Sequence, residues 1–242
     1  DRDSAEYCAS DLYSFINGDD VFFLPDSGRN LERSNYKSSL SVQRTSAIGR
    51  IMDHKEGDRT IIVTYPSAVS EGIPARSAIS DSLLRLSVGD EIDYDTLIRL
   101  LFDNGFERVD FVAEPGQFAV RGALIDIFSY SCNNPFRISF FGDEIETINI
   151  FDSNTQLSKE KTDSVEIYPD LAADEESLEC SIFDILPEDT LVWLDSSDMY
   201  KDASFFKEVG KFTDIYMELP LSRQDEDAVR FNIHPQPVFS KN

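Results

Sequence analysis

Cysteine and histidine are scarce in this chain. Its 242 residues include three cysteines and two histidines. Cys8, Cys132 and Cys180 lie far apart without CxxC spacing, and His54 and His234 are distant from them. Because a structural zinc site normally draws four ligands from short, regular spacings, we expect no zinc site. An odd, sparse set of cysteines is typical of a reducing compartment, which predicts a cytoplasmic protein rather than a disulfide-stabilised one.

The chain also lacks a phosphate-binding loop and long apolar runs. None of its eleven glycines begins a Gly-Lys-Ser or Gly-Lys-Thr triplet, and Gly210-Lys211-Phe212 lacks the hydroxyl that holds magnesium. Ser67 lacks the glycines of a nucleophile elbow. We therefore expect no catalytic residue and no bound ATP, magnesium or other cofactor in this chain. No apolar run approaches a membrane span and no signal peptide opens the chain, so we expect no membrane partner.

Basic charge is the third shortage. The chain has 46 acidic against 22 basic residues and a formal net charge of −24, so a phosphate backbone repels it at long range and the chain is a poor candidate for non-specific nucleic-acid binding. Residues 84–158 contain five arginines, thirteen acidic residues and no lysine. Because arginine pairs with carboxylates through a planar fork, this imbalance favours a protein partner for these arginines.

The first part of the chain alternates between helix and strand patterns. Residues 1–17 have helical spacing that ends at Asn17-Gly18, and residues 41–52 fit an amphipathic helix. Residues 20–24 form a short apolar run, and residues 60–64 form a β-branched run typical of a strand buried in a parallel sheet. The polar residues 26–37 predict a loop. Strand, helix and strand in this order indicate an α/β layer.

The rest of the chain predicts two further groups of secondary-structure elements, separated by a polar stretch. Asp93 predicts the N-cap of a helix over 94–104, and three strand-like runs follow within 106–151. After a polar stretch, strands are expected at 165–169 and 190–195, with a helix at 181–186. We therefore predict an α/β domain in two segments, residues 1–84 and 158–220, interrupted by an α+β module at 85–157. A weakly structured tail is expected at 221–242.

The three strand-like runs are expected to place their arginines on one face. In the first run, alternation turns Val109 and Phe111 inward and leaves Arg108 outward. Arg121 points outward in the second run and Arg137 in the third. If the runs are neighbours in one antiparallel sheet, the three arginines share a face. That face is either the ordinary solvated side of a sheet or a docking surface.

The second run contains a shift of phase. Its apolar positions move to Ile125 and Ile127 after Gly122, and a β-bulge at Gly122 is the expected cause because a bulge adds one residue to a strand. In the third run Phe141 points outward, on the same side as the arginine of that run.

Two groups of acidic residues have ordinary explanations besides functional ones. Asp143, Glu144 and Glu146 could hold a metal, but Phe141-Gly142-Asp143-Glu144 is typical of a hairpin turn. Asp195, at the end of an expected strand, resembles the acid of a nucleotide-binding strand, but an acid there is also a common helix cap. We favour the turn and the cap, so no metal site is predicted.

The module closely resembles the UvrB-like interaction domain of bacterial nucleotide-excision repair. The segments that carry the resemblance are GFERVD at 105–110, EPGQFAVRG at 114–122, IDIF at 125–128 and FRISFFGDEI at 136–145. The resemblance is strong over 86–157 and extends over residues 10–200. The sequence of residues 107–128 is more similar to the branch of the family that couples repair to transcription than to UvrB itself.

The resemblance implies a fold, a partner and site residues. The implied fold is a degenerate, helicase-type (RecA-like) α/β domain with an inserted antiparallel-sheet domain that binds UvrA, the damage-recognition ATPase. Arg108, Arg121 and Arg137 match arginines through which UvrB binds UvrA, and Phe141 would add an apolar contact beside them. Such a factor recruits UvrA to RNA polymerase stalled on DNA, and its ATP-dependent translocase would lie outside this chain.

Three departures from the UvrB pattern limit what carries over. UvrB commonly has an arginine where this chain has Ala119 and an acid where it has Ser139. UvrB also inserts an aromatic hairpin to probe DNA, whereas Tyr36 is the only aromatic residue between Leu24 and Ile61. Two alternatives to recruitment stay open: a nucleotide-binding part of a DNA-dependent ATPase, and an autoinhibitory module whose arginine face is covered by another domain of the same protein.

Overall fold

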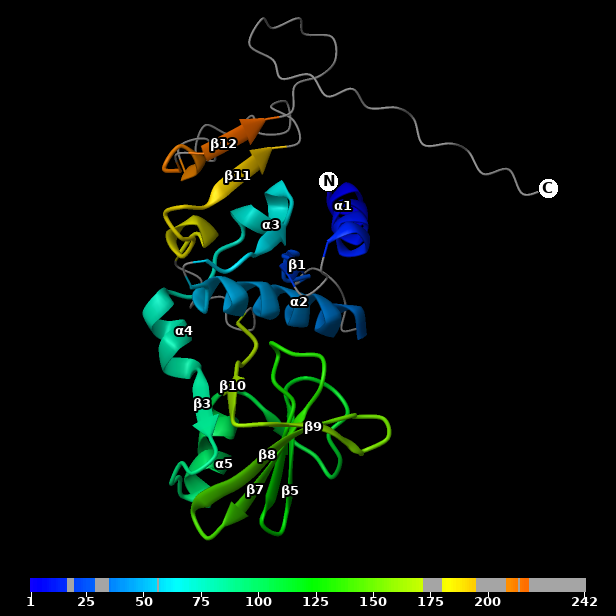
Figure 1. Ribbon diagram of the computed structural model, residues 1–242, viewed down its shortest axis with the longest axis vertical. Coiled ribbons are helices and arrows are strands. Elements are labelled where there is room, and N and C mark those ends of the chain that lie inside the picture. The colour runs from blue at the N-terminus through cyan, green and yellow to red at the C-terminus, as the bar shows by residue number, and fades with distance from the viewer. Residues whose placement is uncertain are drawn as a thin grey trace, which may run out of the picture. The chain divides into compact units, whose positions relative to one another are not determined.

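The computed structural model describes residues 1–16, 20–28, 35–55, 57–171, 180–194, 208–212 and 214–217 (Figure 1). The chain divides into two compact units, residues 1–188 and 189–242, which we describe separately. No helix within the described ranges is both long and apolar enough to cross a membrane. The predicted tail at 221–242 lies outside the described residues, as does most of the acidic segment 170–179.

The N-terminal layer has the predicted α/β character. It contains α1 (Arg2–Phe15), β1 (Val21–Phe23), α2 (Asn35–Met52) and β2 (Ile61–Val63), and β1 pairs with β2 in parallel. Helix α1 packs through Ala5 and Ala9 against Phe23 and Tyr65. The loop predicted at 26–37 is wrong at its end because α2 already begins at residue 35. The side chains of β2 are half-buried rather than fully buried, and among the described residues β2 pairs with β1 alone.

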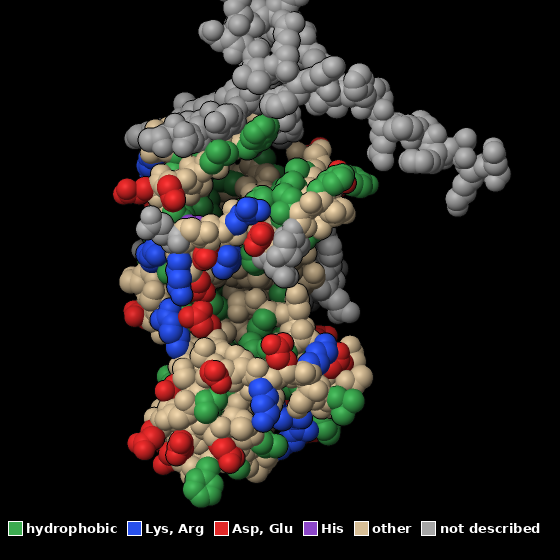
Figure 2. Space-filling model, viewed as in Figure 1, with side chains coloured by type: hydrophobic (Ala, Val, Ile, Leu, Met, Phe, Trp, Pro, Cys, Tyr) green, Lys and Arg blue, Asp and Glu red, His purple; other side chains and the backbone are tan. Residues whose placement is uncertain are grey.

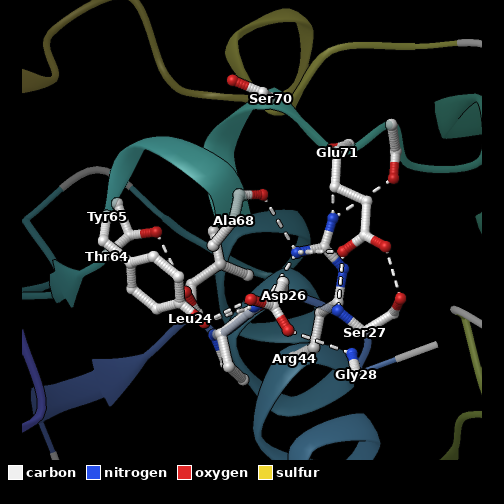
Figure 3. A network of polar contacts seen from close by, with 12 residues as sticks. Leu24, Asp26, Ser27, Gly28, Arg44, Thr64, Tyr65, Ala68, Ser70 and Glu71 are labelled. Atoms are coloured by element: carbon white, nitrogen blue, oxygen red, sulfur yellow. Dashed lines mark hydrogen bonds and ion pairs between the residues drawn. The ribbon is translucent and has the colours of Figure 1, made fainter. Parts of the chain in front are cut away.

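A buried arginine ties this layer together. Arg44 projects from α2 toward α3 (Pro66–Ser70), as Figure 3 shows, and its side chain is 2% exposed. Its Nη1 donates to the carbonyl oxygens of Pro25 at 2.7 Å and Ala68 at 3.2 Å, and its Nη2 donates to those of Glu71 and Gly72. The Glu71 carboxylate lies 3.6 Å from Nη1. One guanidinium therefore satisfies carbonyl groups of the segment after β1, of α3 and of the two residues that follow α3.

Two antiparallel strands join the layer to the inserted module. Strand β3 (Leu84–Ser87) follows α4 (Arg76–Ser82) and enters the module, while β10 (Ser164–Ile167) leaves it. They pair from Leu84↔Ile167 to Ser87↔Ser164 and lie side by side in Figure 1. Leu86, Val165 and Ile167 belong to the hydrophobic core of the module. The strand predicted at 165–169 is thereby confirmed, with its partner in β3.

The module contains one six-stranded sheet in which the strands follow their sequence order. The strands are β4 (Glu107–Arg108), β5 (Gln117–Arg121), β6 (Leu124–Ile127), β7 (Phe136–Phe141), β8 (Glu144–Phe151) and β9 (Ser158–Thr162). Helix α5 (Tyr94–Asp103) covers one face, and Asp93 caps it by accepting from Thr96 N at 2.8 Å, as predicted. The core between α5 and the sheet includes Leu97, Leu101, Phe118, Ile125, Ile127, Ile138 and Phe140.

The bulge predicted at Gly122 is wrong. Arg121 pairs with Leu124, so the second run is two strands joined by the two-residue turn Gly122-Ala123. Gly122 has φ +61° and Ala123 does not have a positive φ, which matches a II′ hairpin turn with glycine first. The hairpin predicted at 141–144 has the same form: Phe141 pairs with Glu144 and Gly142 has φ +64°. A tight turn shifts the apolar phase just as a bulge does, because the strand reverses there.

Strand β4 departs from the expected antiparallel pattern. It is two residues long and pairs with β5 in parallel, Glu107↔Gln117 and Arg108↔Phe118. The turn expected at 114–116 is present, with Gly116 at φ +84°. The sheet also continues past residue 157 through β9, so the module boundary proposed at 157 stays a prediction while the sheet itself ends at Thr162.

The remaining described elements are short. Ile182–Asp184 form a 3₁₀ turn with a capping box between Ser181 and Asp184, where a helix was predicted. In the second unit β11 (Leu191–Leu194) pairs in parallel with β12 (Asp214–Met217). The strand predicted at 190–195 is confirmed, but Trp193 is exposed among the described residues. Asp195 lies outside the described residues.

Candidate partner-binding surface

Strand register decides which side chains share the face of the sheet opposite α5. Ala119 pairs with Asp126, and Asp126 pairs with Arg137, so these three side chains lie on one face. Arg121 is two residues from Ala119 and lies on the same face. Phe141 follows Arg137 by four residues along β7 and also shares it. We call Arg121, Asp126, Arg137 and Phe141, with the adjoining Phe111, the arginine face.

Asp126 lies at the centre of the arginine face. Its side chain is 0% exposed, and both carboxylate oxygens accept from arginine. Arg137 donates from Nε to Oδ1 at 2.7 Å and from Nη2 to Oδ2 at 2.9 Å, and the Arg121 Nη2 donates to Oδ2. Two arginines therefore share one buried carboxylate, which leaves one positive charge uncompensated among these three side chains.

Arg137 is held from several sides. Its side chain is 18% exposed, its Nη1 donates to the Gln156 carbonyl at 3.4 Å, and its guanidinium lies 4.4 Å from the centroid of the Phe151 ring. The hydrogen bonds to Asp126 raise the pKa of Arg137. Gln156 itself has φ +59° and donates to the Val112 carbonyl at 3.2 Å. The arginine thus connects the sheet to the loop between β8 and β9.

Arg121 is more open to solvent than Arg137. Its side chain is 34% exposed, and its guanidinium lies 5.3 Å from the centroid of the Phe111 ring. Phe111 is 63% exposed and Phe141 is 77% exposed. The inward position expected for Phe111 is therefore wrong, because the chain leaves the sheet after Arg108. The outward position expected for Phe141 is confirmed. The arginine face offers one accessible guanidinium next to the exposed Phe111 ring, and it also presents the exposed Phe141 ring.

Arg108 lies on the other face. It pairs with Phe118, whose ring packs against Phe102 of α5, so register turns Arg108 toward the α5 side. Burial raises the pKa of Tyr94 in α5, and the charge of Arg108 opposes that shift, which agrees with their proximity. The expectation that three arginines share a face is therefore wrong for Arg108. The cause is the register of β4 with β5, which pairs Arg108 with the core-facing Phe118.

A comparison with family models identifies the module. Residues 84–172 match the model described as "UvrB interaction domain". This part of the chain is a UvrB interaction domain. The match begins at the first residue of β3 and extends past β10, so it includes both joining strands and all six strands of the sheet. The arginine face is thus a surface of the UvrB interaction domain.

Curated relatives extend the similarity beyond this domain. The chain is 31% identical over 166 residues to the transcription-repair-coupling factor of Bacillus subtilis, which covers 68% of the chain and 14% of that protein. It is 34% identical over 175 residues to the UvrABC system protein B of Thermosipho africanus, covering 71% of the chain and 24% of that protein. The chain therefore spans only a small part of the length of these UvrB-like relatives.

Sequence reasoning missed Asp126 and Phe111 as members of the arginine face, and it missed Gln156, whose carbonyl accepts from Arg137. A signal for Asp126 was available, because it alternates with Ile125 and Ile127 and so lies on the face opposite the core. Opposite charges on neighbouring strands commonly pair across a sheet. No comparable signal marked Phe111, whose exposure depends on where β4 ends.

Outside the arginine face, the described residues show fewer features of a binding or catalytic site. No group of three or more possible metal ligands occurs in the part of the chain that the structure describes, and Asp143 lies in the turn between β7 and β8. Burial raises the pKa of the Cys132 thiol to about 11, so this cysteine stays protonated near neutral pH. On the face seen in Figure 2, basic side chains lie in small groups beside acidic ones, in keeping with the net charge of −24.

Proposed function

We propose that this chain is the UvrA-recruiting module of a factor that couples nucleotide-excision repair to transcription. The observation that carries the proposal is an accessible arginine, Arg121, beside the exposed Phe111 ring and on the same sheet face as the exposed Phe141, in a UvrB interaction domain. The similarity to transcription-repair-coupling factors and to UvrABC system protein B supports the choice of pathway. Arginine and aromatic side chains are enriched at the centres of protein interfaces, which also supports a docking role.

In this proposal the chain binds and does not catalyse. The guanidinium of Arg121 pairs with a carboxylate of UvrA, and Phe141 enters an apolar contact next to it. Arg137 completes the basic face, and Arg108 contributes from the edge strand on the α5 side. Truncating one partner of a desolvated charge pair costs about 2–5 kcal/mol of binding, much of it from the charge left without a partner.

The proposal assigns other tasks to other parts of the protein. Contacts with RNA polymerase and DNA, and ATP-driven translocation, belong to the rest of the protein, because this chain spans 14% of the length of the Bacillus subtilis relative. The parallel pairs β1–β2 and β11–β12 support a degenerate, RecA-like origin for the α/β part. This region needs no cofactor for recruitment, and we place the protein in the cytoplasm with the repair and transcription machinery.

The test is a titration of purified UvrA against the chain and matched variants. Arg121→Ala and Phe141→Ala should each weaken binding strongly. Arg99→Ala on α5 and Phe15→Ala on α1 are the controls, because these side chains are more exposed than the tested ones and lie off the arginine face. Both controls should bind as the unmodified chain does. Failure of the unmodified chain to bind UvrA, or full binding by the Arg121→Ala, Phe141→Ala double variant, would reject recruitment through this face.

A further inference from the structure

The two arginines of the arginine face are not equivalent. All three nitrogens of the Arg137 guanidinium donate to acceptors within the chain: two to Asp126 and one to Gln156. The Phe151 ring covers this guanidinium as well. A partner that used Arg137 as its main contact would have to replace bonds that the fold already makes. Arg137 therefore acts as a structural support for the face.

Arg121 is the arginine with unused donors. Its only hydrogen bond among the described residues is from Nη2 to Asp126, so its Nη1 has no acceptor in the part of the chain that the structure describes. The Phe111 ring and the Asp126 carboxylate together fix the plane of its guanidinium. A carboxylate that binds two guanidinium nitrogens needs this plane in one orientation, because the fork is rigid and planar.

We propose that Asp126 is a positioning residue of the docking surface: it fixes the Arg121 guanidinium in the orientation that a carboxylate of UvrA recognises. The inference rests on the proposed function and names a residue that acts through another. Asp126 itself is buried and cannot touch a partner. Its carboxylate is held by Arg137, so Arg137, Asp126 and Arg121 form a chain of ion pairs that ends at the surface.

Charge and orientation make opposite predictions for Asp126. Asp126→Asn removes one negative charge and so makes the face more positive, and simple attraction of an acidic partner then predicts tighter binding. If Asp126 instead orients Arg121, the Asp126→Asn variant should bind more weakly, because a neutral amide holds a guanidinium less firmly than a carboxylate does. The same charge is removed by Asp143→Asn, in the exposed turn between β7 and β8, without touching either arginine. This variant is the matched control for charge.

The experiment is a double-mutant cycle with purified UvrA as the probe. Asp126→Asn should weaken binding about tenfold, the size expected for losing the support of one oriented contact. Asp143→Asn should bind as tightly as the unmodified chain, or slightly more tightly. In the Arg121→Ala background, Asp126→Asn should cause no further loss, because a positioning residue has nothing left to position. A generally destabilising change would lower affinity in both backgrounds.

Several outcomes would overturn the inference. Binding by Asp126→Asn that equals or exceeds that of the unmodified chain would show that charge, not orientation, matters. A similar loss in both backgrounds would show that Asp126 acts independently of Arg121. If Asp126→Asn does not fold, as circular dichroism would report, Arg121→Lys decides. Lysine keeps the charge without the fork, so full binding by that variant rejects positioning and a loss close to that of Arg121→Ala supports it.

The inference and the proposed function fail in different ways. If the unmodified chain does not bind UvrA, the proposed function fails and the cycle is not reached. If the unmodified chain binds and Arg121→Ala does not, recruitment stands, and the Asp126 variants alone then decide whether the buried carboxylate orients the contact.

Discussion

The guanidinium of Arg137 lies 4.4 Å from the centroid of the Phe151 ring while it donates two hydrogen bonds to Asp126. One arginine thus bridges a buried carboxylate and the fully buried ring of Phe151, which packs in a second hydrophobic cluster with Val112, Ala119 and Phe128. An arginine with these contacts stabilises the fold, whether or not it also binds a partner. Substitution of Arg137 and substitution of Arg121 should therefore have different effects on folding stability.

Arg137→Ala should lower stability more than Arg121→Ala. Removing Arg137 takes two hydrogen bonds from the 0% exposed Asp126 and leaves its Oδ1 without a donor among the described residues. A buried, charged acceptor without a donor costs about 3 kcal/mol. Arg121 is more exposed, so its loss should cost about 1 kcal/mol. Urea titrations followed by circular dichroism measure both values. Equal midpoints for the two variants would contradict the division of roles between the two arginines.

Arg108→Ala should weaken UvrA binding by less than about 1 kcal/mol, the range for a solvent-exposed charge. The reason is its position, since pairing with Phe118 turns it away from the face that holds Arg121. Titrations of UvrA at low and high salt should show the small loss mainly at low salt, because exposed charges are screened. A loss from Arg108→Ala as large as that from Arg121→Ala would place the docking surface across the edge of the sheet instead.

The carboxyl group of Asp53 should make stability fall as pH rises from about 4 to about 6. Burial, then the neighbouring Glu166, raises the pKa of Asp53 from 3.8 to about 6, while Tyr168 and Arg85 act in the opposite direction. The Tyr168 hydroxyl donates to Asp53 Oδ2 at 3.1 Å. Between about pH 4 and pH 6 the folded state therefore keeps a proton on Asp53 that the unfolded state has released. Above about pH 6 Asp53 ionises in the folded protein as well, at a cost in stability.

Asp53→Asn removes this titration and keeps an acceptor for Tyr168. The Tm of the variant minus that of the unmodified chain should rise through the same window and stay level above about pH 7. Asp81→Asn, which replaces an exposed carboxylate on α4, should show no comparable rise. A Tm difference for Asp53→Asn that does not change with pH would contradict the raised pKa.

Gly116→Ala should destabilise the chain by about 2–4 kcal/mol, from backbone strain and overpacking together. Gly116 has φ +84°, and a Cβ there would lie 2.7 Å from Cε2 of Tyr130. Gly142→Ala is the control: it has φ +64° but open space around the added Cβ, so it should cost about 1 kcal/mol. Equal melting temperatures for the two variants would show that the Tyr130 ring moves aside without cost.

Much of the module was predictable because its strands alternate strictly. Phe136, Ile138 and Phe140 face the core and Phe141 faces solvent, as alternation requires. Asp93 at the start of α5 was equally clear, since a side-chain acceptor before an apolar helix satisfies its first amides. These features depend on neighbours in the sequence, so the sequence alone contains the information.

Pairing between distant segments was not predictable in the same way. At Gly122 a bulge and a two-residue turn cause the same phase shift, and only the Arg121↔Leu124 pairing distinguishes them. The parallel pairing of β4 and β5 was unexpected, because parallel neighbours usually need a long crossover. The register of this pairing, Arg108↔Phe118, changed the face assigned to Arg108, and the end of β4 exposed Phe111. Both errors concern tertiary pairing rather than local preference.

The pairing of β3 with β10 makes the UvrB interaction domain a portable segment. Its chain enters and leaves through adjacent antiparallel strands, from Leu84↔Ile167 to Ser87↔Ser164. Any host protein with two neighbouring strand ends of this kind could accept it by a single genetic insertion, with no rerouting of the host chain. All side chains of the arginine face lie between these two junctions, so a graft of residues 84–167 into another protein would carry the whole face with it.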